Sequence, residues 1–263
     1  MKVILVQSIK GGCGKSLVAI NIAEELSKKY RVGLIDADVD SPNIPGMIGM
    51  NKKMEQGPDK RFIPKEWTLK DHKPIKLVSP GLLDDGQITL FKTGEETRQI
   101  LYDLIMRTEW GDVDYMIVDL PAGSGDEFRA VLSVLAQYIM GVILVTLPTT
   151  LEDCSRVVDL CTRNGIRIIG MIDNQDGTLT TCGCKAICPE CGEEFNPYCS
   201  HIGDAPTAEK VSATFELRFL GKIPLTEGFY AKVLSGMPIL PDAARGAIEE
   251  AVRVIITGTE GSE

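Results

Sequence analysis

Seven residues close to the start of the chain have the types and the spacing of a phosphate-binding loop: Lys10-Gly11-Gly12-Cys13-Gly14-Lys15-Ser16. Glycines let backbone N–H groups turn inward around phosphate oxygens, because no Cβ obstructs their approach. A lysine followed by a hydroxyl residue supplies an ammonium for the β and γ phosphates and an oxygen ligand for Mg²⁺. The sequence therefore predicts a nucleotide site in which Lys15 and Ser16 fill these two roles.

The predicted elements on either side of this loop are those that a phosphate site needs. Val3–Gln7 is an apolar run that predicts a strand, and Leu17–Tyr30 has the apolar spacing of a helix, whose positive N-terminus would point at the phosphates. A tight glycine turn without a ligand is the plainer alternative, but the flanking elements and the two lysines argue against it. The residues predicted to contact nucleotide here are Gly11, Gly12, Cys13, Gly14, Lys15, Ser16 and Leu17.

Two further apolar runs end in aspartate, and these carboxylates are candidate Mg²⁺ ligands. Val32–Asp36 and Tyr115–Asp119 predict buried strands, and Asp38 follows the first of them by two residues. Ligands bind at the carboxyl edge of a parallel sheet, where such strands end. We expect Asp119 to hold Mg²⁺ or its waters, as a Walker B acid does, and Asp36 to lie near the metal. Asp38 stands in a turn-rich string, so a surface turn acid is the alternative for it.

Five of the eight cysteines are clustered in one segment: Cys182, Cys184, Cys188, Cys191 and Cys199. In a reducing compartment such clustering indicates metal binding rather than disulfides. Cys188 and Cys191 are separated by two residues, which lets both thiolates face one metal, and Pro189 stiffens the loop between them. The first four of the five also suit a zinc site within one subunit, and free thiols without metal are a further alternative.

The composition argues against some partners. The 263 residues carry a net charge of −9, whereas binding to DNA, RNA or anionic lipid requires clustered Lys and Arg. No apolar run reaches the length of about 18 residues that a membrane span needs, and Val3–Val6 is too short for a signal peptide. We therefore expect a cytoplasmic protein that binds neither nucleic acid nor membrane.

Strands and helices alternate along the chain, which predicts an α/β fold with a mostly parallel, twisted sheet flanked by helices. We expect one domain over residues 1–263. Asn51–Pro74 is polar and predicts a long surface excursion, Asp173–Pro206 predicts an insertion with the five cysteines, and Thr257–Glu263 predicts a frayed tail. Further helices are predicted at Thr97–Arg107, Phe128–Tyr138, Glu152–Arg163, Thr207–Phe215, Thr226–Leu234 and Asp242–Ile256, and further strands at Gly141–Thr146, Ile166–Ile172 and Phe219–Lys222.

The lysine that opens the loop distinguishes it from the usual phosphate-binding loop. Lys-Gly-Gly-x-Gly-Lys-Ser resembles the deviant Walker A motif of the MinD/ParA-type ATPases. The resemblance implies that Lys10 reaches across a homodimer to the partner's phosphates, and that Asp38 is the switch I aspartate that orients the attacking water. It implies ATP as the nucleotide, since Asn174 stands where this family carries an adenine-contacting Asn. The family's Glu-Asn-Met is replaced here by Asp-Asn-Gln at positions 173–175.

Several other segments are similar to the Mrp/ApbC branch of these ATPases, which consists of iron–sulfur cluster carriers and scaffolds: Trp110–Glu127, Cys188–Cys191, Phe219–Leu225 and Ser235–Ile239. The resemblance spans nearly the whole chain and is weakest over 51–74 and 177–186. It implies that Cys188 and Cys191 of two subunits hold one [4Fe–4S] cluster at the homodimer interface, since a cubane cluster takes four thiolates. It also implies slow ATP hydrolysis coupled to cluster binding or transfer, with apo iron–sulfur proteins as recipients.

Two other functions would use the same nucleotide site. A MinD/ParA-like positioning ATPase that binds membrane would end in a basic amphipathic helix, whereas Ala243–Ile256 includes Glu249 and Glu250, the wrong charge for anionic lipid. An ATPase metallochaperone with structural zinc in the cysteine segment differs only in its partner, which no residue identifies. Cys182, Cys184 and Cys199 depart from the simple carrier pattern and remain candidate ligands for either metal.

Overall fold

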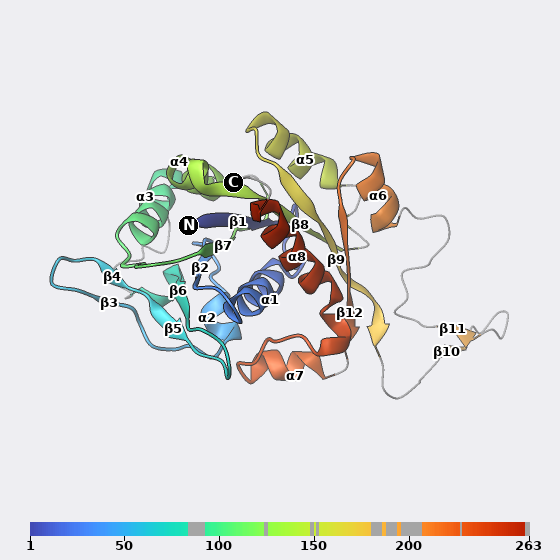
Figure 1. The fold of residues 1–263 in the computed structure, drawn as a ribbon, viewed down its shortest axis with the longest axis horizontal. Helices are drawn as coiled ribbons and strands as arrows, with labels where there is room; N and C mark the ends of the chain where they lie inside the picture. Colours follow the sequence, from blue (N-terminus) through green and yellow to red (C-terminus); the bar gives the residue numbers. More distant parts are fainter. Residues whose placement is uncertain are drawn as a thin grey trace.

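The computed structural model describes residues 1–83, 93–123, 126–147, 150, 153–179, 186–187, 194–195, 207–226 and 228–260. An eight-stranded sheet forms the centre of the fold, with the strand order β12-β9-β8-β1-β7-β2-β6-β5 (Figure 1). All neighbouring strands run parallel except β5, which pairs antiparallel with β6 at the edge. The predicted α/β fold with a mostly parallel sheet is therefore confirmed.

The central strands are buried along nearly their whole length, as expected for parallel strands with helices on both faces. The eight strands are β1 (Lys2–Gln7), β2 (Val32–Asp36), β5 (Lys65–Trp67), β6 (Ile75–Val78), β7 (Tyr115–Asp119), β8 (Ile139–Thr146), β9 (Ile168–Leu179) and β12 (Phe219–Thr226). Because β1, β2 and β7 lie side by side in register, their carboxyl ends meet at one edge of the sheet. That edge carries the phosphate-binding loop and both strand-end aspartates.

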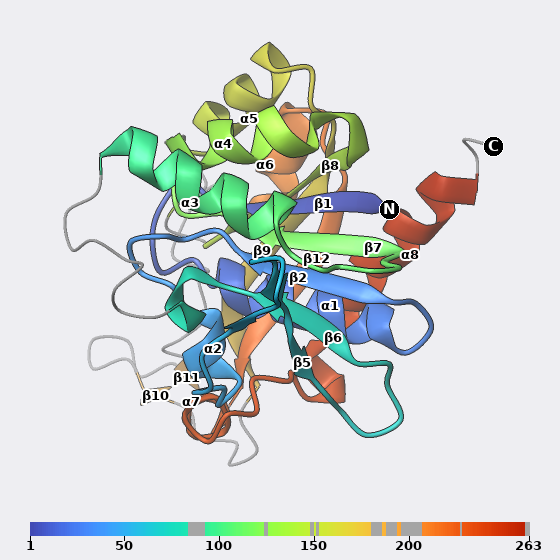
Figure 2. The ribbon, with the colours of Figure 1, turned by 90° about the vertical axis from the view of Figure 1, so that its left-hand side faces the viewer.

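Helices cover the two faces of the sheet (Figure 2). One face is covered by α1 (Lys15–Ser27) and α8 (Gly246–Glu260), and the other by α3 (Gly94–Met106), α4 (Asp126–Leu135) and α5 (Cys154–Arg163). The short helices are α2 (Ile44–Met47), α6 (Ala208–Thr214) and α7 (Phe229–Leu234), with 3₁₀ turns at Pro80–Leu82, Ala136–Tyr138 and Asp242–Ala244. No helix in the described ranges is long and apolar enough to cross a bilayer.

The polar segment Asn51–Pro74 is more ordered than we predicted. It forms the hairpin β3 (Glu55–Gln56) and β4 (Phe62–Ile63) and then β5 of the main sheet, and it buries Phe62 and Trp67. The predicted strands also omitted β6, which directly follows this segment. Both errors have one cause: the apolar residues stand singly or in short runs among polar ones, and some of their partners lie far away in sequence. The backbone N–H of Phe62, for example, donates to the carbonyl of Arg107.

Several other boundaries differ from the prediction. The strand predicted at Phe219–Lys222 continues to Thr226, so the helix predicted from Thr226 begins at Phe229. Residues 173–179, assigned to the insertion, continue β9 and pair with β12, so the sheet extends past the predicted boundary. The predicted frayed tail is wrong up to Glu260, because α8 continues to that residue. Between β9 and α6 the structure describes only β10 (Ala186–Ile187) and β11 (Glu194–Phe195), which pair antiparallel. The five clustered cysteines lie outside the described residues.

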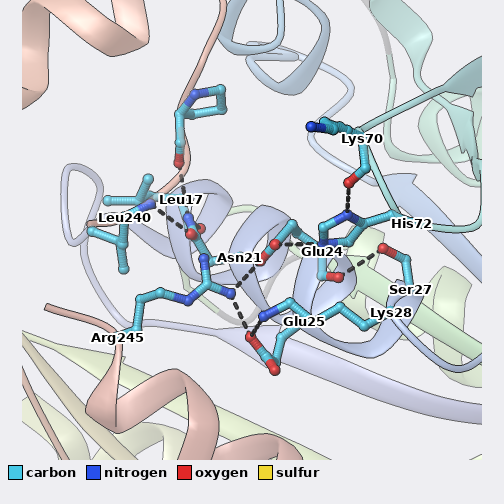
Figure 3. Close-up of polar contacts among 11 residues, drawn as sticks. Leu17, Asn21, Glu24, Glu25, Ser27, Lys28, Lys70, His72, Leu240 and Arg245 are labelled. Atoms are coloured by element: carbon cyan, nitrogen blue, oxygen red, sulfur yellow. Dashed lines mark hydrogen bonds and ion pairs between the residues drawn. The ribbon is translucent and has the colours of Figure 1, made fainter. Parts of the chain in front are cut away.

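Helix α1 fastens three distant segments to the sheet (Figure 3). The Asn21 amide donates to the carbonyl of Pro238 and accepts from the N–H of Leu240, at 2.9 Å each. The buried carboxylate of Glu24 pairs with Arg245 and lies 2.8 Å from Nε2 of His72, which the sequence did not indicate as half-buried. A buried ion pair is costly unless hydrogen-bonded on both sides, as it is here. The helix that follows the phosphate-binding loop is thus firmly held.

Candidate functional site

The phosphate-binding loop connects β1 to α1, and its glycines adopt conformations that other residues rarely adopt. Gly12 and Gly14 both have φ of +80°. At Gly14 a Cβ would also lie 2.1 Å from Nδ2 of Asn174. That same amide nitrogen donates to the carbonyl of Cys13 at 2.9 Å. Asn174, in the middle of β9, therefore braces the loop, and glycine is required at position 12 by backbone geometry and at position 14 by backbone geometry and by space.

A pocket of about 550 Å³ opens in front of this loop. Its polar part is lined by the loop, the start of α1, the segment after β2 and the end of β7, while an apolar wall comes from β12, α7 and the segment before α8. The lining residues are Gly11, Gly12, Gly14, Lys15, Ser16, Leu17, Asp38, Ser41, Asn43, Met47, Asp119, Leu120, Ala122, Asn174, Gln175, Ile223, Pro224, Leu225, Thr226, Phe229, Val233 and Leu240. A polar end joined to an apolar wall suits a ligand with phosphates and a planar base.

Asp119 ends β7 inside this pocket, and one of its oxygens has no protein partner. Oδ2 accepts a hydrogen bond from the hydroxyl of Ser16 at 2.5 Å. Oδ1 is the one buried side-chain nitrogen or oxygen of the described residues that lacks a hydrogen-bond partner. Burial raises the pKa of this carboxyl to about 7, against the opposing effects of Ser16 and Lys15. A divalent cation beside Ser16 and Asp119 would supply the missing partner, so the residues present fit Mg²⁺.

Asp36 lies behind Asp119 and is fully buried. Its oxygens accept hydrogen bonds from Ser79 Oγ at 2.9 Å and from the N–H groups of Asp38 and Ile44 at 3.3 Å. Burial, and then the neighbouring charge of Asp119, hold the pKa of the Asp36 carboxyl well above its usual range. Because its oxygens are already engaged, Asp36 organises the loop after β2. Ser79 was missed in the sequence because β6, the strand before it, was missed.

Asp38 lines the pocket and is half-buried, so it is neither a core residue nor a fully exposed one. Its Oδ1 accepts a hydrogen bond at 2.9 Å from the N–H of Ser41, which also lines the pocket. Asp38 is therefore both an acid in a turn and a residue that lines the pocket. The turn thus holds the carboxylate of Asp38 in the lining of the pocket.

The two lysines of the loop have different surroundings. Lys15 is buried to 9% exposure and lines the pocket, and no carboxylate in the described part of the chain lies within ion-pair distance of it. Lys10 keeps 54% of its side chain exposed and forms a 2.6 Å ion pair with Asp153 of the same chain, just before α5. That ion pair lowers the pKa of Asp153. Lys15 is thus positioned for a ligand, while Lys10 is directed to Asp153 and is not among the residues that line the pocket.

The sequence matches, over residues 1–259, the family described as "NUBPL iron-transfer P-loop NTPase". The chain belongs to this family. Two relatives illustrate it. The cytosolic Fe–S cluster assembly factor CFD1 of Kluyveromyces lactis is 32% identical over 232 residues, which cover 86% of this chain and 77% of that protein. An iron–sulfur cluster carrier protein of Rickettsia typhi is 38% identical over 179 residues, covering 66% of this chain and 53% of that one.

Solved structures agree with the fold of this P-loop NTPase. A nucleotide-binding protein from Archaeoglobus fulgidus in complex with ADP superposes with a TM-score of 0.66 at 24% identity, covering 89% of this chain and 86% of that one. The cell division ATPase MinD of Pyrococcus furiosus superposes with a TM-score of 0.65 at 18% identity, covering 97% and 98%. The predicted MinD/ParA-like fold is therefore confirmed.

The three scattered cysteines of this NTPase are core residues. Cys13, Cys154 and Cys161 are all buried, and Cys13 Sγ lies 4.0 Å from Thr150 Oγ1, directed away from the pocket. Burial raises the pKa of the Cys154 thiol to about 12 and that of Cys161 to about 11. Thiols with such pKa values stay protonated at neutral pH and are poor metal ligands.

Proposed function

We propose that this protein is an ATP-dependent iron–sulfur cluster carrier that delivers clusters to apo iron–sulfur proteins. The observation that carries the proposal is the family match over residues 1–259, together with a phosphate pocket whose Asp119 lacks one partner. Named relatives are Fe–S assembly factors and carriers. A metal-delivery function and a nucleotide site are thereby supported on one chain.

The nucleotide in this proposal is MgATP. Lys15 and the loop N–H groups bind the β and γ phosphates, while Ser16 and Asp119 hold Mg²⁺ and Asp36 supports the loop beside them. The cation would neutralise phosphate charge. Asn174, which braces the loop, also lines the pocket, and it contacts the base in our proposal. The apolar wall of Ile223, Phe229 and Leu240 covers that end.

Slow hydrolysis and dimerisation depend in this proposal on Asp38, which lines the pocket, and on Lys10, which is half-exposed. Asp38 orients the attacking water from its turn. Lys10 leaves Asp153 and contacts the phosphates held by a second copy of the chain. Its long, half-exposed side chain supports this role, since an exposed ion pair contributes little energy and is readily exchanged.

The cargo is a [4Fe–4S] cluster held by Cys188 and Cys191 of each subunit in a homodimer. Four thiolates complete such a cluster, and one subunit with this pair supplies two of them. Cys182, Cys184 and Cys199 are the remaining candidate ligands. Zinc bound within one subunit is the competing occupant of the same segment.

Anaerobic reconstitution with iron and sulfide tests the proposal, followed by Mössbauer spectroscopy and iron counting. The wild-type protein should bind about four iron atoms per dimer as a cubane cluster, and Cys188→Ala should lose it. Cys161→Ala is the matched control, because that thiol is buried in α5 and should leave the iron content unchanged.

One result would overturn the carrier assignment, and another would overturn the ligand assignment. One is tight binding of zinc, one per subunit, with no cluster formed under any reconstitution condition. The other is a cluster whose iron count and spectrum are the same in wild type and Cys188→Ala. The first outcome favours the zinc-containing metallochaperone, and the second assigns the cluster to other cysteines.

A further inference from the structure

Gln7, the last residue of β1, is completely buried and uses both ends of its amide group. Nε2 donates to the carbonyl of Gly123 at 2.6 Å, and Oε1 accepts from the N–H of Ser8 at 2.8 Å. Gly123 lies four residues after Asp119, and Ser8 lies two residues before Lys10. One side chain therefore joins the segment that follows the metal-binding carboxylate to the segment that leads into the phosphate loop.

Three backbone and hydroxyl contacts extend this connection. The N–H of Gly123 donates to the carbonyl of Ser8 at 3.0 Å, and the N–H of Leu120 donates to the carbonyl of Val6 at 3.1 Å. The Ser8 hydroxyl donates to the carbonyl of Lys10 at 2.8 Å. Residues 120–123 thus lie along residues 6–8, and Gln7 closes the arrangement at the end where β1 and β7 have stopped pairing.

We propose that Gln7 is a positioning residue for nucleotide hydrolysis, which fixes Asp119 and the phosphate loop in one geometry. The inference rests on the proposed ATPase function and goes beyond it, because Gln7 lines no part of the pocket. Catalysis of phosphoryl transfer consists mainly of positioning, and a misplacement of about 1 Å can cost about 100-fold in rate. Binding of the diphosphate depends more on the loop N–H groups and Lys15, which are also held by the contact of Asn174 with Cys13 and by α1.

Gln7→Met and Gln7→Glu test this role. Methionine keeps the length of the side chain and removes both hydrogen bonds, whereas glutamate keeps the shape but cannot donate to Gly123 when ionised. Asn21→Met is the matched control, since Asn21 is equally buried and its amide also joins backbone groups, those of Leu17, Pro238 and Leu240 (Figure 3). It lies outside the connection between the loop and Asp119.

The measurements are kcat for ATP hydrolysis, Kd for ADP and Tm. Both Gln7 variants should lose at least about 10-fold in kcat while Kd for ADP stays within about twofold of wild type. The Tm of Asn21→Met should fall by about as much as the Tm of the Gln7 variants, while its kcat stays within about twofold of wild type. If Gln7→Met does not fold, Gln7→Glu carries the same comparison.

If the wild-type protein hydrolyses ATP, two results overturn the inference alone. One is a kcat of the Gln7 variants that stays within about twofold of the wild-type kcat. The other is a loss of kcat in Asn21→Met that equals the loss in the Gln7 variants. Those outcomes would make the Gln7 amide a general stabiliser of the core. Absence of hydrolysis by the wild-type protein would instead overturn the proposed ATPase function, and this inference with it. The two failures are therefore distinguishable in one set of assays.

Discussion

At the amino end of β7, Asp114 lies near the surface and pairs with Arg31, whereas at the carboxyl end of the same strand Asp119 is buried beside Ser16 and Asp36. The Arg31 guanidinium, which donates two hydrogen bonds to Asp114, holds the pKa of that carboxyl at about 2. Burial raises the pKa of Asp119 to about 7. Five positions along the chain, from just before β7 to its last residue, thus separate two opposite electrostatic environments.

The neighbouring strand β2 has the same asymmetry. Arg31 precedes it and is paired with carboxylates, while Asp36 ends it and is buried with a strongly raised pKa. The amino edge of the sheet satisfies its own charges and so contributes to stability. The carboxyl edge leaves Asp119 Oδ1 without a partner and Lys15 without a carboxylate, which costs stability until a ligand binds. This difference locates the binding edge without reference to any relative.

The largest effect is expected from removing the ammonium of Lys15. Lys15→Met should weaken ADP binding by about 100-fold, because charged hydrogen bonds to phosphate are worth roughly 3 kcal/mol. Arg31→Met, at the other edge of the sheet, should leave the affinity unchanged. Isothermal titration calorimetry measures both, and equal affinities for the two variants would remove the distinction between the edges.

Neutralising one aspartate at each end of β7 should change stability in opposite directions. Asp119→Asn should stabilise the nucleotide-free protein by about 2 kcal/mol at pH 7.5. The raised pKa of Asp119 means that its buried charge costs up to about 4 kcal/mol, and burial of the new amide offsets about half of the gain. Asp114→Asn should destabilise it by about 0.5 kcal/mol, because an ion pair near the surface is partly screened. Urea unfolding without Mg²⁺ measures both values. The comparison fails if both substitutions change the free energy of unfolding in the same direction.

The pH dependence of these two effects should also differ. The lowered pKa of Asp114 means that its stabilising effect is complete above about pH 4 and is lost as pH falls toward about 2. The raised pKa of Asp119 means that its cost is absent below about pH 4, grows as pH rises, and is complete above about pH 7. Unfolding of wild type and each variant across this range measures the differences. A flat difference for Asp119→Asn would contradict burial as the cause.

Much of the fold could be predicted because the central strands can be recognised from their local sequence. The strands Val32–Asp36 and Tyr115–Asp119 were predicted with their observed bounds, since each is an uninterrupted apolar run that ends at an aspartate. The start of α3 at Gly94 was missed, although Thr93 and Glu96 form a capping box there. The polar end of β9 was missed because β12, a distant strand, stabilises it.

The residue types of the site could be predicted, but not the contacts among them. Glycine spacing identifies the phosphate loop, and strand ends identify Asp36 and Asp119. The pairing of Lys10 with Asp153 and of Gln7 with Gly123 joins residues more than a hundred positions apart, and no local pattern encodes such contacts. These contacts form only when the folded sheet brings distant segments of the chain together.

The most direct test of the carboxyl edge as a metal–nucleotide site is the effect of Mg²⁺ on the affinity for ATPγS. Titration calorimetry with and without Mg²⁺ should show at least about tenfold tighter binding with Mg²⁺ for the wild-type protein. For Asp119→Asn the enhancement should fall below about twofold. An equal enhancement in both proteins would show that Mg²⁺ does not use Asp119, and would contradict the account.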